Sequence, residues 1–226
     1  MNVRHPVPDE VLLDYVAGCA SPGKGLLVET HLAICEPSRD RFEMLREVGG
    51  ALLETLEAAP LEGVSAEAVL ARATRAAEPE FAARCPASPR SQRAVELCGT
   101  RLPPPLAAFA GEALDRRAWR TLGRGVEAAL LSCSTPRGRT QLLQARPGIR
   151  ILPHTHDGEE LVLVLRGGFW DGGTYFGPGD VAVSDDSQVH APVIDDAEPC
   201  LCLAVNEGPI RFVGPAGWLF NRFNRF

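Results

Sequence analysis

The sequence lacks a long apolar run, an excess of basic residues and a dense set of cysteines. No stretch approaches the roughly 18 apolar residues of a membrane-spanning helix, and the opening MNVRHPVPDE has no apolar secretory core. We therefore expect a cytoplasmic protein with no membrane partner. A formal net charge of −6 argues against direct nucleic-acid binding, which needs a basic surface. Seven cysteines, an odd number, favour reduced thiols or metal ligands over structural disulfides.

Residues 1–78 have the apolar spacing of a unit of four helices, as expected for a soluble protein with 45% apolar residues. The second helix is expected at 25–35. A break follows at Glu36-Pro37, after which Ser38 is expected to cap the third helix, and Ser65 is placed to begin the fourth. The excess of acidic residues in this part suits a basic protein partner, although a solvated acidic surface would also explain it.

After residue 78, the composition and the spacing of apolar residues change twice. Residues 79–105 are rich in proline, alanine and arginine, which predicts a linker. Residues 106–226 consist of short apolar or alternating runs separated by glycine-rich turns, without helices between them. This pattern is typical of an antiparallel sandwich or barrel, so we predict an α+β chain in which a four-helix domain (1–78) precedes a β domain (106–226).

The strongest motif is GIRILPHTHDGEELVLVLRG, residues 148–167. His154 and His156 are two positions apart on an expected strand, so both side chains point to one face. Glu160 begins the next strand, and His190 follows a Gly-Pro-Gly-Asp turn and another strand. Three imidazoles and one carboxylate suit a divalent transition metal such as zinc, iron, manganese or nickel. Glu159 is an alternative to Glu160, although the spacing favours Glu160.

This stretch resembles the cupin family, whose fold is a double-sheet jelly-roll barrel with a metal in its mouth. It fits Gly-x5-His-x-His-x3-Glu-x6-Gly at every defined position. The second cupin motif is partial, because the Gly179-Asp180 turn and His190 are present but a terminal asparagine is not. The fold alone leaves the function open, since such barrels serve isomerases, dioxygenases and ligand sensors.

The helical part contains a second candidate metal site in HLAICEPSR, residues 31–39. On a helix, His31 and Cys35 lie one turn apart on the same face and could clamp a zinc ion. A further cysteine would be expected three residues after Cys35, but Ser38 stands there. Water, Cys19 or Asp40 could complete such a site. Alternatively, the helices hold together without metal, or Cys35 is simply a small buried apolar residue.

The whole chain resembles the ChrR-type zinc anti-sigma factors. The resemblance includes the MNVRH start, the VETHLAIC helix, the WRTLGRGV entry to the barrel, the cupin motif and the CLCLAV strand. It implies that the N-terminal helices bind an extracytoplasmic-function sigma factor and keep it from RNA polymerase. It also implies that the cupin domain releases the sigma factor in response to singlet oxygen or organic peroxides. The implied helical zinc site is His5, His31 and Cys35, degenerate because of Ser38.

Cys200 and Cys202 lie two apart on an expected strand and face the same way, a poor arrangement for an unstrained disulfide. Burial as small core residues explains them, but the matching pair in the resembled family keeps a redox or secondary metal role open.

We therefore expect an anti-sigma factor, not an enzyme, with zinc in the cupin site in a structural or sensory role. The main alternative is a cupin metalloenzyme, a small-molecule dioxygenase or isomerase, with an accessory helical domain. A third reading is an anti-sigma domain that has lost its partner, for which Ser38 is the only indication.

Overall fold

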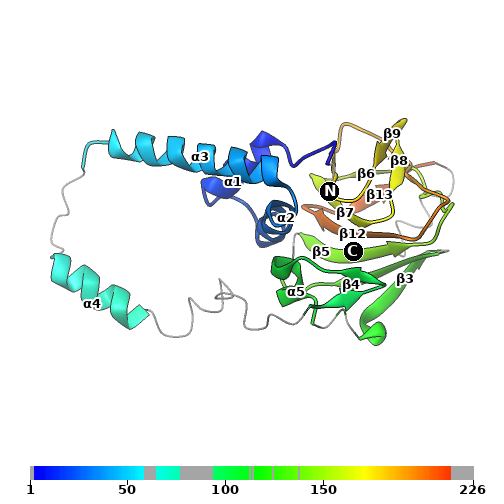
Figure 1. Ribbon diagram of the computed structural model, residues 1–226, viewed down its shortest axis with the longest axis horizontal. Coiled ribbons are helices and arrows are strands. Elements are labelled where there is room, and N and C mark those ends of the chain that lie inside the picture. Colours follow the sequence, from blue (N-terminus) through cyan, green and yellow to red (C-terminus); the bar gives the residue numbers. More distant parts are fainter. Residues whose placement is uncertain are drawn as a thin grey trace.

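The computed structural model describes residues 3–58, 65–76, 94–111, 113, 115–123, 125–136 and 138–214. Helices come first along the chain and an antiparallel barrel follows (Figure 1). The expected combination of N-terminal helices and a C-terminal β domain is thus confirmed. The first part of the expected linker, residues 77–93 with Cys85, lies outside the described residues. Within the described residues, no helix has the length and apolar character needed to cross a membrane.

The N-terminal helices are α1 (Asp9–Val16), α2 (Pro22–Leu32), α3 (Glu36–Glu54) and α4 (Ala66–Ala76). Ser65 caps α4 as expected, because its hydroxyl accepts a hydrogen bond from the backbone N–H of Ala68. The predicted starts of α2 and α3 were too late. Ser21 caps α2, and Pro22 and Pro37 occupy the first turns of their helices, where a missing N–H costs nothing. Ser38 therefore lies inside α3.

Six antiparallel strands form the main sheet in the order β10-β7-β12-β5-β4-β3. Their bounds are β3 (Trp119–Gly123), β4 (Val126–Leu130), β5 (Arg139–Ala145), β7 (Glu160–Arg166), β10 (Val181–Ser184) and β12 (Cys200–Asn206). Two smaller sheets complete the barrel. They are β11-β8-β9, formed by β8 (Phe169–Asp171), β9 (Thr174–Phe176) and β11 (Val193–Ile194), and β13-β6, formed by β6 (His154–His156) and β13 (Ile210–Phe212).

The expected linker 79–105 extends too far toward the C-terminus. Residues 96–101 form a hairpin of β1 (Glu96–Leu97) and β2 (Thr100–Arg101), and α5 (Pro104–Phe109) follows after the two-residue connection 102–103. Leu97, Leu102 and Leu106 are all buried in the main hydrophobic core. The prolines that indicated a linker instead begin a helix, because proline is well tolerated in a first helical turn.

The helices and the barrel share one hydrophobic core. The strand β12 is buried on both faces. Leu201, Leu203 and Val205 belong to the core cluster that contains Leu27 of α2, whereas Cys200 and Cys202, on the other face of β12, belong to a second cluster inside the barrel. Figure 1 shows α2 lying against this side of the sheet, while α3 projects away from the barrel and α4 lies apart from it.

Candidate metal centre

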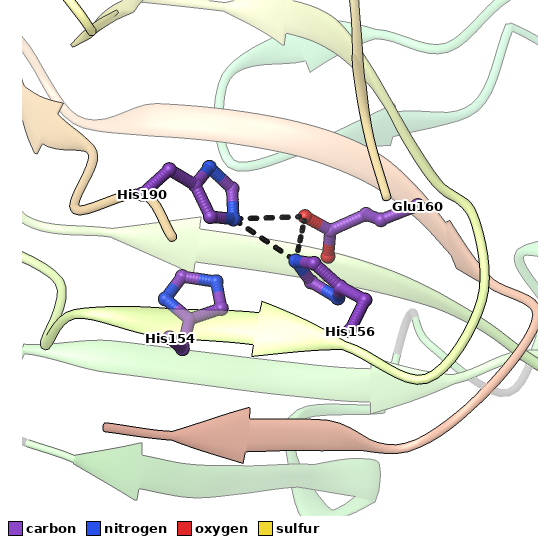
Figure 2. A group of neighbouring side chains, drawn as sticks. All are labelled: His154, His156, Glu160 and His190. Carbon is purple, nitrogen blue, oxygen red and sulfur yellow. Dashed lines mark hydrogen bonds and ion pairs between the residues drawn. The ribbon is translucent and has the colours of Figure 1, made fainter. Parts of the chain in front are cut away.

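Four side chains from three parts of the barrel converge at the centre of the motif, as Figure 2 shows. His154 and His156 are the two ends of β6, and their side chains lie on one face, as strand geometry requires. Glu160 begins β7, and a backbone bridge to His154 holds His190 beside β6. The structure therefore brings together the four residues that the sequence motif selects.

The donor atoms of these residues have the spacing of a metal site. His156 Nε2 lies 2.9 Å from His190 Nε2 and 3.3 Å from Glu160 Oε2, and His190 Nε2 lies 3.9 Å from the same oxygen. All four ligand atoms lie within 4.8 Å of one another. Ligands in a tetrahedron around a zinc ion, with bonds of about 2.0–2.1 Å, would be about 3.3 Å apart. This donor set fits such an ion.

A second ring of contacts orients three of the four side chains. Asp171 accepts a hydrogen bond from His190 Nδ1 at 2.7 Å, and the Leu152 carbonyl lies 2.8 Å from His154 Nδ1, so both histidines present Nε2 to the centre. Asn206 donates to Glu160 Oε1 at 2.6 Å, which leaves Oε2 facing the histidines. Such partners are typical of metal ligands, whose orientation and basicity they set.

The electrostatics of the centre favour neutral imidazoles. Burial lowers the pKa of His154 and of His156 to about 4, and repulsion from neighbouring histidines adds to the effect. Burial raises the pKa of Glu160, although the hydrogen bond from Asn206 opposes this shift. Neutral imidazoles have a free lone pair, which is the form that binds a metal ion.

A cavity of about 640 Å³ opens beside this centre. His154, Glu160 and His190 are among the residues that line it. Its walls are mostly apolar and include Leu143, Val162, Phe169, Ala182, Ile194 and Cys202. The barrel therefore has room for a small apolar molecule next to the four donor groups.

The neighbour of Glu160, Glu159, points away from the centre and pairs with α2. Its carboxylate lies 2.7 Å from the ammonium group of Lys24. Burial alone would lower the pKa of Lys24, but Glu159, with smaller contributions from Glu207 and Asp14, raises it. The hydroxyl of Ser21 donates to Glu207 at 2.6 Å. The N-terminal end of α2 is thus bonded to the residues next to Glu160 and Asn206.

The structure does not bring His5 to the helical candidate site. The ring of His5 packs on Phe176, with centroids 4.8 Å apart. Its backbone N–H donates to the buried carboxylate of Asp180, and its carbonyl accepts from Val181 N–H. These contacts fix the N-terminal segment along the edge strand β10, so His5 belongs to the barrel surface. This is a correction to the ligand set that the resemblance implied.

His31, Cys35 and Ser38 do lie together, buried between α2 and the start of α3. Among the described residues, however, no third histidine, cysteine or carboxylate joins His31 and Cys35 in a group that could hold a metal. Cys19 is exposed, and Asp40 lies on the exposed side of α3.

Cys200 and Cys202 are buried and unbridged, with their sulfur atoms 3.4 Å apart, and both line the cavity. The hydrogen bond with Cys200 and burial both raise the pKa of Cys202, which favours the protonated thiol. A redox role for the pair stays a prediction.

Sequence reasoning missed Asp171, Asn206 and Lys24. Asp171 lies in a Trp-Asp-Gly-Gly turn, where an acidic residue usually needs no functional explanation. Asn206 ends an otherwise apolar strand, which is the one signal that could have identified it. The pairing of Lys24, the only lysine of the chain, depends on tertiary structure alone.

Three comparisons bear on this arrangement. The family model described as the ChrR cupin-like domain matches residues 110–211. The anti-sigma-E factor ChrR of Cereibacter sphaeroides is 37% identical over 215 residues, which cover 94% of this chain and 93% of that protein. The solved structure of Rhodobacter sphaeroides SigE in complex with the anti-sigma ChrR matches with a TM-score of 0.68 and 34% identity, over 91% of this chain and 99% of the matched chain.

Proposed function

Because the chain belongs to the ChrR family of anti-sigma factors, we propose that it binds an extracytoplasmic-function sigma factor and holds it away from RNA polymerase in the cytoplasm. The support is the likeness to ChrR over nearly the full length, which includes the helices that precede the barrel. The proposed role is a protein–protein interaction of the helical part and requires no catalysis.

An exposed apolar stripe on α3 carries this proposal. Met44, Val48 and Leu52 follow one another at intervals of four residues, so they lie along one side of the helix. They are 46%, 52% and 62% exposed, although large apolar side chains of this kind are usually buried. On α4, Leu70 is 67% exposed. Contiguous apolar surface on a projecting helix is typical of a helix that packs against a protein partner.

The stripe can be tested directly on the full chain. Leu52→Asp should weaken sigma-factor binding by at least about 30-fold, because a buried interface anchor contributes about 2 kcal/mol or more. Arg46→Glu is the matched control, since it adds negative charge at an exposed position on the other side of α3. Titration calorimetry would measure both affinities. Equal binding by the two variants would show that the stripe is not the sigma-factor surface.

We also propose that the barrel centre holds a zinc ion through His154, His156, Glu160 and His190. When bound, such an ion would have four protein ligands and would link β6, β7 and the segment before β11 to one another. Four protein ligands would close its coordination sphere, which suits a structural or sensory role. Elemental analysis should find one zinc per chain in the wild type and none in His156→Ala. Iron or manganese at full occupancy would contradict the zinc assignment.

The cavity beside the centre favours one second candidate function, a cupin metalloenzyme that acts on a small apolar molecule. Metal-dependent turnover of such a molecule by the full chain, together with the absence of sigma-factor binding, would favour this alternative.

We further propose that oxidative stress, as singlet oxygen or organic peroxide, acts on the barrel and reaches the helices through α2. The ion pair of Lys24 with Glu159 and the hydrogen bond of Ser21 with Glu207 join α2 to the neighbours of Glu160 and Asn206. A change at the centre would therefore alter how α2 sits on the sheet. The buried thiols Cys200 and Cys202 line the same cavity and are the candidate targets of the oxidant.

The proposed path predicts that Lys24→Met changes how much peroxide is needed to release the sigma factor. Arg211→Met is the control, because Arg211 forms an ion pair with Asp157 that stays within the barrel. Pull-down of the complex over a peroxide series would measure release. Identical release curves for wild type, Lys24→Met and Arg211→Met would contradict the path. Unchanged release in the double variant Cys200→Ser/Cys202→Ser would show that the two thiols are not the targets of the oxidant, without contradicting the path through α2.

A further inference from the structure

The buried cluster of His31, Cys35 and Ser38 occupies the place where the family resemblance implies a zinc ion. His31 is 0% exposed, Cys35 2% and Ser38 3%. The cluster lies where α2 ends and α3 begins, so it fixes the angle between the two helices. Buried polar groups at such a junction need partners, either an ion or one another.

The three side chains are partners of one another through His31 Nε2, Ser38 Oγ and Cys35 Sγ, whereas the buried His31 Nδ1 has no hydrogen-bond partner among the described residues. His31 Nε2 lies 2.9 Å from Ser38 Oγ, and the Ser38 hydroxyl is 3.2 Å from Cys35 Sγ, with geometry for donating to it. The backbone N–H of Val7 also donates to His31 Nε2, at 3.3 Å. The Val7 N–H therefore already engages the nitrogen lone pair that would bind zinc. Because Nε2 is then an acceptor, the single hydroxyl proton of Ser38 goes either to Nε2 or to Cys35 Sγ; when it goes to Nε2, the Cys35 thiol can donate to the Ser38 oxygen.

In the described part of the chain, no further residue that could serve as a zinc ligand lies beside His31 and Cys35. His5 is fixed on Phe176 and β10. Asp180, whose charge acts on His31, already accepts the backbone N–H groups of Arg4, His5 and Gly177 through its two oxygens. Cys35 is thus the only thiol in the cluster, and Ser38 offers a neutral oxygen that zinc sites in proteins do not use.

The charge balance also opposes a metal ion. A zinc ion held by one thiolate and neutral ligands would leave about one positive charge in a site that is closed to water. A second thiolate at position 38 would cancel that charge. With serine there, the neutral hydrogen-bonded cluster is the arrangement that burial favours.

We propose that Ser38 converts this junction into a metal-free, hydrogen-bonded cluster, so that the helical part folds and keeps its partner surface without zinc. The chain then binds a single metal ion, in the barrel. Chelators and thiol oxidation act on the protein through the barrel and not through this junction. This inference uses the family membership but not the sigma-factor proposal, since metal content is measured without any partner.

Cobalt substitution separates the two sites in the full chain, because only a site that contains a thiolate gives a sulfur-to-cobalt charge-transfer absorption. The wild type should bind one cobalt ion and show no such absorption, since the barrel ligands are nitrogen and oxygen. Ser38→Cys should bind a second ion and gain the absorption, and adding Cys35→Ser to it should remove both. His156→Ala/Ser38→Cys should keep the thiolate site alone.

Two results would overturn the proposal. A wild-type chain with two ions and a charge-transfer absorption that Cys35→Ser abolishes would show that Ser38 tolerates a metal site. A well-folded Ser38→Cys variant that binds only one ion would show that Ser38 is not what excludes the metal. Circular dichroism of each variant in strong chelator gives a second readout: His156→Ala with Ser38 intact should keep its helix signal, and loss of that signal would contradict a metal-free junction.

Discussion

Replacing Gly23 with alanine should destabilise the contact between α2 and the barrel. A Cβ atom at this position would overlap Thr140 Oγ1 and lie 3.0 Å from Val205 Cγ1, both closer than side-chain atoms normally approach. Thr140 is β-branched and buried in the strand β5, so it has little freedom to rotate away. The helix itself would have to move off the sheet, and the contacts of Ser21 and Lys24 would move with it.

Overpacking of this kind costs about 1–3 kcal/mol, which in a chain of this size lowers the melting temperature by about 2–4 °C per kcal/mol. Thermal denaturation followed by circular dichroism should therefore show a loss of about 2–12 °C in Gly23→Ala. Gly50→Ala is the matched control, because Gly50 lies in α3 with no atom within 4 Å of an added Cβ. It should be neutral or stabilising, since alanine favours helices. An unchanged melting temperature in Gly23→Ala would refute the close packing of α2 on the barrel.

Two further predictions concern the centre and the junction. Asp171→Asn should lower metal affinity by about 10–100-fold, because it weakens the hydrogen bond that orients His190. Competition with a chromophoric chelator measures the affinity. The control is Asp185→Asn, a substitution at an exposed position, which should leave the affinity unchanged. Burial lowers the pKa of His31 from 6.5 to about 4, with Gly179 and Asp180 opposing the shift. Between pH 6.5 and 4, His31 is therefore protonated in the unfolded chain but stays neutral in the folded chain. The free energy of unfolding should fall by up to about 3 kcal/mol as the pH drops through this window. Urea titrations should show that loss in the wild type and less of it in His31→Gln, and equal pH dependence in both would contradict the burial of a neutral His31.

The local spacing rules predicted which four side chains converge in the barrel, because the positions of these residues obey them. The alternation of His154 and His156, and the position of Glu160 at the start of a strand, follow from strand geometry alone. The four N-terminal helices and the strand-rich character of the C-terminal part also followed from periodicity.

Tertiary contacts explain what the sequence did not predict. Composition indicated a linker through residue 105, yet Leu97 and Leu102 are in the core, and proline-rich composition cannot distinguish a linker from the first turn of a helix. The family resemblance implied that His5 lies near His31, whereas the buried Asp180, far along the chain, fixes it elsewhere. The shared core of Leu27 and Leu203 also shows that the helices are not independent of the barrel.

The most direct test of the account is transcription in vitro from a promoter that depends on the extracytoplasmic-function sigma factor proposed as the partner. Adding the full chain to that sigma factor before RNA polymerase should abolish the transcript at about one equivalent, and Leu52→Asp should require far more protein to do so. Undiminished transcription in the presence of excess well-folded protein would contradict the proposal that this chain is an anti-sigma factor for that partner.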